Sequence, residues 1–290
     1  MSSTTRVEVP FTKMEGLGND YLYIDRFHYK TDHDWGALSR AMAERHFGAG
    51  SDGIILIEPG DKAPLRMRIF NADGSEGDMC GNGMRCFTRY VYDHGIAKDT
   101  HMVVETRHGL IYPVVNVKDG VIESISVDMG VPLFARKDVP FAPEGPEPVV
   151  NEPVTVDGQV YLVTALSTGN PHGVIFVDDV WKVDLEDVGP KLERHPAFPR
   201  KANIEFAKIR SKTLIDMRVW ERGSGITLAC GTGACAVMVA AALNGYTEKD
   251  IPVTVRLPGG PLTIEWKSDN HVWMTGPARE VYRGFFFYEP

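Results

Sequence analysis

Cysteine is scarce in this chain, and long apolar runs are missing. The 290 residues include only 4 cysteines, too few for a disulfide-rich scaffold, so we expect a reducing compartment, the cytoplasm. No apolar run approaches the roughly 18 residues that a membrane-spanning helix needs. Met1 to Glu8 contain neither an apolar core nor a basic cluster, so the sequence predicts no signal or transit peptide and no membrane partner.

Basic residues are also in the minority. The 31 lysines and arginines face 39 acidic residues, a net charge of −8, and such a balance argues against a nucleic-acid or anionic-membrane surface. Hydrophobic residues make up 43% of the chain and charged residues 24%. This composition is typical of globular proteins, and the length allows one large domain or two of ordinary size.

The chain contains an internal repeat. The segment Met67–Phe70 is followed by the motif Cys80–Gly83. The similar segment Met217–Trp220 is followed at the same interval by Cys230–Gly233, so the two copies lie 150 positions apart. A Gly-Asn pair at positions 18–19 also recurs at 169–170. We therefore predict two similar halves: residues 1–130 with Cys80, and residues 131–276 with Cys230.

Strand patterns dominate both halves. Helices are expected at 34–46, at 81–94 and at 231–243, the last two directly after the cysteine motifs and ending at glycine. Five prolines between 140 and 153 indicate an irregular loop or an insertion. Many strands around one buried helix, formed twice, predict an α+β fold. The predicted strands are 109–117, 121–128, 161–166, 173–177, 204–209, 253–257, 262–266 and 271–275.

Cys80 and Cys230 each precede a helix in a glycine-rich turn. The unpaired N–H groups and the dipole of a helix N-terminus favour negative charge, so we expect a lowered thiol pKa and a place for a carboxylate. Two such thiols on opposite faces of one carbon could exchange a proton. One thiolate would remove the α-hydrogen and the other thiol would return one, which inverts the stereocentre without a cofactor.

Other uses of the cysteines fit less well. Cys86 and Cys235 fall inside the predicted helices and are expected to be inert buried residues. The spacings Cys-x₅-Cys and Cys-x₄-Cys do not match zinc pairs, so no metal site is predicted. A Cys80–Cys230 disulfide in a thiol redox protein stays open as an alternative, although no Cys-x-x-Cys motif is present.

The remaining polar candidates suit a small zwitterionic ligand. Asn71 and Glu221 occupy equivalent places in the repeat, and Arg222 follows directly. An amide, a carboxylate and a guanidinium could together bind ammonium and carboxylate groups. His172 lies next to a loop asparagine and could tune a thiol. The loop or strand-end asparagines are Asn19, Asn71, Asn170 and Asn203.

Five ordered blocks resemble one protein family over nearly the whole chain. They are Phe11–Asp20, Asn71–Glu76 with Cys80–Cys86, Thr168–His172, Asn203, and Glu221–Gly225 with Ala229–Ala234. In this order they resemble the diaminopimelate epimerases. The resemblance implies a cofactor-independent isomerase that interconverts LL- and meso-diaminopimelate in lysine biosynthesis, in the cytoplasm and as a homodimer.

The same resemblance implies the fold and the residue roles. Each half would be a barrel-like sheet around a central helix, with the site in the cleft between the halves and the last strand, 277–290, returning to the first. Cys80 and Cys230 would be the acid–base pair, and His172 and Glu221 would modulate their pKa values. The implied substrate-binding residues are Asn19, Asn71, Gly81, Asn82, Asn170, Asn203, Glu221, Arg222, Gly231 and Thr232.

The chain departs from the family pattern at three positions. Gly53 stands where many members carry glutamine, Ile226 where glutamate is frequent, and Met79 where a polar residue is frequent. These differences bear on fine specificity rather than on reaction type. A racemase or epimerase of proline, hydroxyproline or glutamate stays open as the nearest alternative, whereas the related PhzF-like isomerases lack the cysteine pair.

Overall fold

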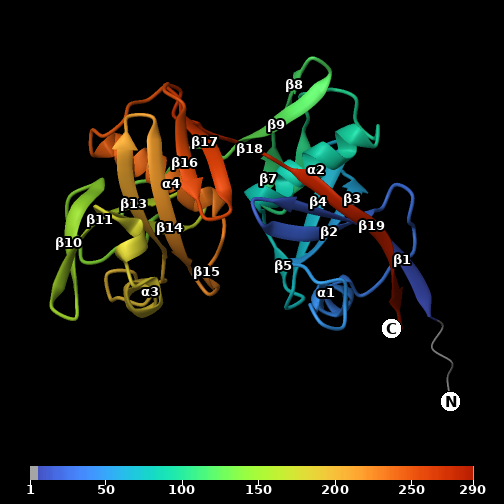
Figure 1. Cartoon of the computed structure of the whole chain (residues 1–290), viewed down its shortest axis with the longest axis horizontal. Coiled ribbons are helices and arrows are strands. Elements are labelled where there is room, and N and C mark those ends of the chain that lie inside the picture. The colour runs from blue at the N-terminus through green and yellow to red at the C-terminus, as the bar shows by residue number, and fades with distance from the viewer. Residues whose placement is uncertain (1–5, 290) are drawn as a thin grey trace. The chain divides into compact units, whose positions relative to one another are not determined.

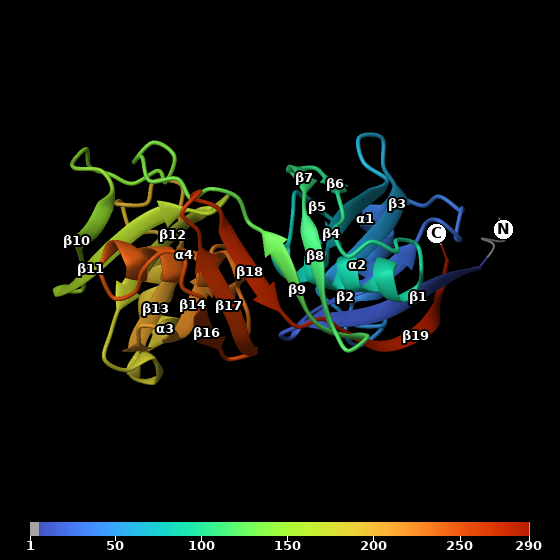
Figure 2. The same ribbon diagram turned by 90° about the horizontal axis from the view of Figure 1, so that it is seen from above.

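The repeat in the sequence recurs in the order and direction of the strands. The computed structural model describes residues 6–289 and divides into two units. The first comprises the described residues up to Val127 together with those from Gly276 onward, and the second comprises Asp128–Thr275. Figures 1 and 2 show both units, each with strands gathered about a helix.

The first unit holds one sheet, a two-stranded hairpin and two helices. The sheet runs in the order β19-β1-β2-β3-β4-β6-β7, with β5 beside β4. The hairpin is β8 with β9. The elements are β1 (Val7–Gly16), β2 (Asn19–Asp25), α1 (Trp35–Ala43), β3 (Gly53–Pro59), β4 (Leu65–Asn71), β5 (Glu76–Gly77), α2 (Gly81–Asp93), β6 (Val104–Thr106), β7 (Gly109–Ile111), β8 (Pro113–Lys118), β9 (Val121–Asp128) and β19 (Arg279–Tyr288).

The second unit repeats this plan. Its sheet runs β10-β11-β12-β13-β14-β16-β17-β18, with β15 beside β14. The elements are β10 (Val149–Val156), β11 (Gln159–Ser167), β12 (Pro171–Phe176), the 3₁₀ turn η1 (Val180–Lys182), α3 (Leu185–Glu193), β13 (Asn203–Ser211), β14 (Leu214–Glu221), β15 (Gly225–Ile226), α4 (Gly231–Leu243), β16 (Val253–Leu257), β17 (Gly260–Trp266) and β18 (Val272–Gly276).

Strand directions match pair by pair. In the first unit β1–β2 and β3–β4 are antiparallel, whereas β2–β3 and β4–β6 are parallel. In the second unit β11–β12 and β13–β14 are antiparallel, whereas β12–β13 and β14–β16 are parallel. The structure thus confirms the predicted α+β fold with two similar sheet-rich halves.

A central helix packs against the strands of each unit. α4 contacts β11, β12, β13, β14, β16 and β17, and its residues from Gly233 to Ala241 are buried. Its apolar composition on every side explains this position, because such a helix is stable only when protein surrounds it. α2 contacts β1, β2, β3, β8 and β19 in the same way.

Two further helices cover the outer faces of the sheets. α1 packs on β3 and β4, and α3 packs on β13 and β14. Asp34 and Asp184 cap them, each accepting a hydrogen bond from the backbone N–H three residues on. The sequence patterns above predict no helix over α3, and the structure places Gly189 and Pro190 inside it. The repeat does predict a helix there, because the helix predicted at 34–46 shifted by 150 residues covers the position of α3.

The predicted strand 109–117 is wrong in one respect, since the chain changes partners inside it. β7 pairs with β6, and β8 pairs with β9 after a break at Tyr112. Pro113 lacks an N–H and restricts the residue before it, which explains the break. The segment predicted to be irregular, 140–153, is irregular only up to Pro148, because β10 begins at Val149 and includes Pro153. Buried Arg136 holds the irregular part by donating to the carbonyls of Pro143 and Pro146 at 2.6 and 3.2 Å.

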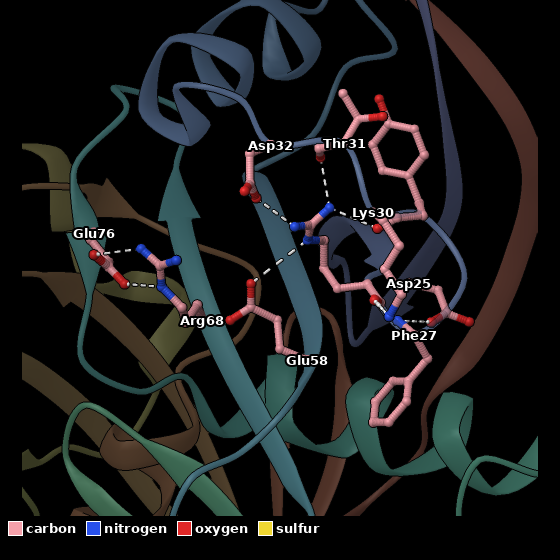
Figure 3. Close-up of polar contacts among 10 residues, drawn as sticks. Asp25, Phe27, Lys30, Thr31, Asp32, Glu58, Arg68 and Glu76 are labelled. Carbon is pink, nitrogen blue, oxygen red and sulfur yellow. Dashed lines mark hydrogen bonds and ion pairs between the residues drawn. The ribbon is translucent and has the colours of Figure 1, made fainter.

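A polar network joins the loop after β2 to the sheet of the first unit (Figure 3). Arg26 donates to the Thr31 carbonyl and to Asp32 at 2.6 and 2.5 Å, and its Nε lies 3.9 Å from Glu58 of β3. Beside it, Arg68 of β4 donates to Glu76 of β5 at 2.7 Å. The contacts of Arg26 hold the loop that leads to α1, and the Arg68–Glu76 pair joins β4 to β5.

Among residues 6–289 no helix is long and apolar enough to cross a membrane. Residues 1–5, which belong to the segment predicted to lack a targeting signal, lie outside the described residues. So does Pro290, at the end of the predicted last strand.

Candidate active site

The two motif cysteines occupy equivalent positions, as N-caps of α2 and α4. Both have extended backbones, with φ −136° at Cys80 and −121° at Cys230. Each sulfur accepts a hydrogen bond at 3.3 Å from the backbone N–H three residues on, Gly83 or Gly233. Each thiol therefore lies at the positive end of a helix dipole, beside N–H groups of the first turn.

Close contacts beneath the helices account for Gly83 and Gly233. A Cβ at position 83 would lie 2.8 Å from Cδ1 of Ile55, and a Cβ at position 233 would lie 2.7 Å from Oε1 of Glu205. Ile55 and Glu205 hold equivalent places on β3 and β13. The first turn of each helix thus sits directly on a strand, and a larger residue at either position would require the side chain beneath it to shift.

In the first unit, Asn19 connects Cys80 to an acidic residue. The Cys80 thiol donates to Oδ1 of Asn19 at 3.4 Å, and Nδ2 of Asn19 donates to Asp52 at 2.7 Å. Burial raises the pKa of the Asp52 carboxyl, against the opposing hydrogen bonds from the Asp20 backbone and from Asn19. Asn19 is therefore held with its amide oxygen toward the thiol.

Asn71 and Asn82 lie at two other edges of this half-site. Asn71 ends β4 and donates to Oγ of Ser75 at 3.0 Å. Asn82 is buried in the first turn of α2, next to Gly81, and accepts from Arg85 at 2.9 Å. The first unit thus carries the predicted residues Asn19, Asn71, Cys80, Gly81 and Asn82.

Cys230 is enclosed more tightly than Cys80, with 4% of its surface exposed. Burial raises the pKa of its thiol well above the usual value, and the nearby carboxylates of Glu221 and Glu205 raise it further. Hydrogen bonds from Thr232 and from the Gly233 backbone lower it, but these effects are smaller. The lowered pKa that we predicted from the helix terminus is therefore wrong for Cys230, because desolvation and negative charge outweigh the dipole.

Glu221 ends β14 and faces Cys230. Burial raises the pKa of its carboxyl, opposed by hydrogen bonds from Thr227 and Cys230, while Glu205 adds to the increase. Arg222 is exposed, and its guanidinium contacts the Arg200 carbonyl at 3.5 Å. A carboxylate beside the thiol and a guanidinium in solvent suit opposite ends of a zwitterion.

His172 lies at the centre of a buried polar chain. Its Nδ1 is 2.7 Å from Oε1 of Glu205, and its Nε2 is 2.8 Å from Oδ1 of Asn170. The side chains of His172 and Glu205 are both fully buried. The chain therefore links a strand inside the sheet to the loop asparagine at position 170.

Asn203 ties two loops of the second half-site together. Its Nδ2 donates to the Pro171 carbonyl at 3.1 Å, and its Oδ1 accepts from the Arg222 backbone at 2.8 Å. Thr168 binds the carbonyl of Thr232 at 3.1 Å, which holds the same loop against the start of α4. The second unit carries the predicted residues Asn170, His172, Asn203, Glu221, Arg222, Cys230, Gly231 and Thr232.

The other two cysteines are buried inside the helices. Burial raises the pKa of the Cys86 thiol to about 12, and Cys235 is fully enclosed in α4. None of the four cysteines forms a disulfide in the structure. In the part of the chain from Arg6 to Glu289, no three His, Cys, Asp or Glu side chains are placed to hold a metal ion.

Sequence reasoning missed Glu205 and Asp52. Glu205 is a single acid within the otherwise apolar strand Ile204–Ala207, and its repeat partner is Ile55; that contrast was a usable signal. Asp52 carried no comparable signal.

At Gly53 the backbone has φ +147°, and a Cβ would lie 2.1 Å from the Phe70 carbonyl. This backbone therefore leaves no room for the glutamine of many family members.

Comparison with known proteins identifies the family. The family model described as diaminopimelate epimerase matches residues 11–135 and 164–281. A diaminopimelate epimerase from Oceanobacillus iheyensis is 48% identical over 287 residues, covering 98% of this chain and 99% of the relative. One from Desulfitobacterium hafniense is 50% identical over 274 residues, covering 94% and 96%.

Solved structures share the fold at low identity. A PhzF-family phenazine biosynthesis protein from Bacillus anthracis matches with a TM-score of 0.71 at 16% identity, over 96% of this chain and 99% of that one. A hydroxyproline epimerase from Agrobacterium vitis matches with a TM-score of 0.68 at 13% identity, over 97% and 92%. These likenesses concern the fold alone. The sequence matches, which span nearly the whole chain, show that it belongs to the diaminopimelate epimerase family.

Proposed function

We propose that this protein is a pyridoxal-phosphate-independent isomerase that interconverts LL- and meso-2,6-diaminopimelate. The observation that carries the proposal is the matched pair of cysteine N-caps, Cys80 and Cys230, in a chain 48% identical to a diaminopimelate epimerase over almost its full length. Lysine biosynthesis in the cytoplasm is the corresponding cellular role.

The two thiols act on one α-carbon from its two faces. In one direction the Cys230 thiolate takes the α-hydrogen as a proton, so that the C–H bond breaks and an S–H bond forms. The electron pair stays on the substrate as an enolate-like carbanion. The Cys80 thiol then gives its proton to the opposite face of that carbon and becomes a thiolate. The reverse direction exchanges the roles, and no oxidant or reductant is consumed.

The helix N-termini stabilise the charge that develops. Backbone N–H groups of Gly81-Asn82 and of Gly231-Thr232 bind the substrate carboxylate, and the dipoles of α2 and α4 favour the added negative charge. Asn19, Asn71, Asn170, Asn203 and Arg222 hold the remaining polar groups of the substrate.

The charge around Cys230 prepares that thiol for the substrate. Without ligand, burial and the carboxylates of Glu221 and Glu205 keep its pKa high. An incoming ammonium group offsets these negative charges, so substrate binding lowers the thiol pKa. Glu221 modulates the thiol pKa directly, and His172 acts on it through the carboxyl of Glu221. The Cys230 thiolate therefore forms once the substrate is bound.

Two alternatives lead to different results. An epimerase of hydroxyproline, proline or glutamate would use the same fold, which the hydroxyproline epimerase of Agrobacterium vitis shares at 13% identity. A thiol redox protein would use a Cys80–Cys230 disulfide and would exchange no α-hydrogen. Family membership favours diaminopimelate over both, and by analogy with the family we propose a homodimer.

Proton NMR of the purified protein with LL-diaminopimelate in D₂O, under reductant and without added cofactor, tests the proposal. We expect the α-proton signal to disappear while the meso isomer forms. If LL-diaminopimelate keeps its α-proton but hydroxyproline, proline or glutamate loses it, the substrate assignment is wrong. If none of these loses it, the epimerase assignment is wrong.

A further inference from the structure

Glu205 is the most unusual polar residue outside the predicted site. It is fully buried in β13 with the core residues Ile204 and Phe206 on either side. Its Oε2 is buried and, among the described residues, has no hydrogen-bond partner. A buried carboxylate oxygen without a partner is costly, so its presence calls for a specific role.

Glu205 lies between three elements of the second half-site. Oε1 is 2.7 Å from Nδ1 of His172 on β12. The absence of a side chain at Gly233 lets the first turn of α4 settle onto the carboxylate. The titratable groups around Glu205 are His172, Glu221 of β14 and Cys230. The carboxylate thus sits under the reactive thiol but binds the imidazole.

The hydrogen bonds of His172 determine whether its Nε2 atom carries a hydrogen. Nε2 faces the amide oxygen of Asn170, which only accepts, so Nε2 carries a hydrogen. Nδ1 and the Glu205 carboxyl share one further proton, whichever atom holds it. With Glu205 present, the ring always donates through Nε2, and Asn170 keeps its oxygen toward the ring and its NH₂ group free to donate elsewhere.

We propose that Glu205 is a positioning residue, which holds His172 so that the Asn170 amide presents its NH₂ group to the substrate carboxylate. This inference rests on the proposed function, in which Asn170 binds substrate. In the first unit the equivalent places hold Ile55 on β3 and Tyr21 on β2, so neither the carboxylate nor the imidazole is repeated there.

Two substitutions separate hydrogen bonding from charge. Glu205→Ile copies the residue that the same backbone already accommodates at position 55, and it leaves Nδ1 without a partner. Glu205→Gln removes the charge but can donate its amide hydrogen to Nδ1, so Nε2 keeps its hydrogen. We expect KM for diaminopimelate to rise by roughly tenfold or more in Glu205→Ile, and by no more than about threefold in Glu205→Gln.

Asp216 offers a matched control. It is a buried carboxylate on β14, paired with Arg210 and Arg256 at 2.6 and 2.5 Å. Asp216→Asn should leave KM unchanged even where it lowers stability. Equal KM values in Glu205→Ile and Glu205→Gln would overturn the proposal, because the hydrogen bond would then not be what positions Asn170.

A measurement on the unmodified protein does not depend on activity. The ¹⁵N shifts of the His172 ring, assigned by their loss in His172→Gln, report which nitrogens carry hydrogen. We expect Nε2 to be protonated. A bare Nε2 overturns the inference while leaving the proposed reaction intact. A protonated Nε2 in a protein that exchanges no α-proton supports the geometry while refuting the function.

Discussion

The surroundings of Cys80 and Cys230 follow one backbone plan but differ in charge. Both sulfurs cap a helix and accept a hydrogen bond at 3.3 Å from the glycine three residues on. Beneath Gly83 lies a methyl group of Ile55, whereas beneath Gly233 lies the carboxylate of Glu205. Cys80 is partly exposed, and Cys230 is buried.

The difference shows what the repeat has retained. Strand order and direction depend on backbone hydrogen bonds and on which face of each strand is apolar, and both are the same in the two units. Side chains on the inner face near the helix terminus can change without altering that frame. The second unit therefore has an acidic, buried environment for its thiol, which the first unit does not share. The substitutions run from Tyr21 to His172, Ile55 to Glu205 and Asn71 to Glu221.

Removing either thiol should have the largest effect on activity. Cys80→Ala and Cys230→Ala should each lower epimerisation by about a thousandfold or more, since each removes one proton carrier. Cys235→Ala, within α4, serves as the control and should keep its activity. Measured as formation of meso-diaminopimelate, full activity in either motif variant would contradict a two-base reaction.

Neutralising Glu221 should reveal the charge asymmetry. Its carboxylate raises the pKa of the Cys230 thiol, so Glu221→Gln should lower that pKa. The limb of the pH–rate profile that requires the Cys230 thiolate then moves to lower pH. Activity near neutral pH should fall by roughly tenfold through loss of a substrate contact. A limb that stays in place, as expected for Asp216→Asn, would show that Glu221 does not act on the thiol.

The two glycines beneath the cysteines should differ in tolerance. Gly233→Ala forces its methyl group against Glu205, which His172 holds in place, and should cost about 1–3 kcal/mol in the free energy of unfolding. Gly83→Ala meets Cδ1 of Ile55, a terminal methyl that can rotate away, and should cost less. Urea unfolding of both variants measures the difference. The reverse order would mean that the Glu205 carboxylate is not fixed.

The caps of the outer helices should show the smallest contrast. Asp34→Ala and Asp184→Ala each remove an N-cap, at about 1 kcal/mol. The first turn of α3 also contains Glu186 and Asp187, whereas that of α1 contains no acid. These carboxylates favour the helix N-terminus by themselves. The melting temperature should therefore fall less for Asp184→Ala, and a larger fall there would argue against this compensation.

Much of the backbone could be predicted from local patterns. The helix predicted at 231–243 matches α4, and the one at 81–94 differs from α2 by one residue at its end. The strand 253–257 matches β16. Local prediction failed at α3, which contains glycine and proline and was not expected to be helical, although the repeat places a helix there. It also failed at Tyr112, where the chain passes from β7 to β8 and changes its pairing partner.

The candidate site was predictable in its members but not in its electrostatics. Asparagines, cysteines and glycines stand out by type and spacing, so the motif residues could be named. The direction of the Cys230 pKa could not be predicted, because it depends on how deeply the thiol is buried and on Glu205. That residue is 25 positions away along the chain.

The sequence by itself determined the duplication, the two cysteines as helix caps and the family, because these follow from residue types at fixed intervals. Only the tertiary structure decided which residues lie beneath those caps. It placed the Glu205 carboxylate beneath Gly233 and a methyl group of Ile55 beneath Gly83. Desolvation and Coulomb interactions depend on distances in space, so the charge state around each thiol is a property of the packed sheet and helix.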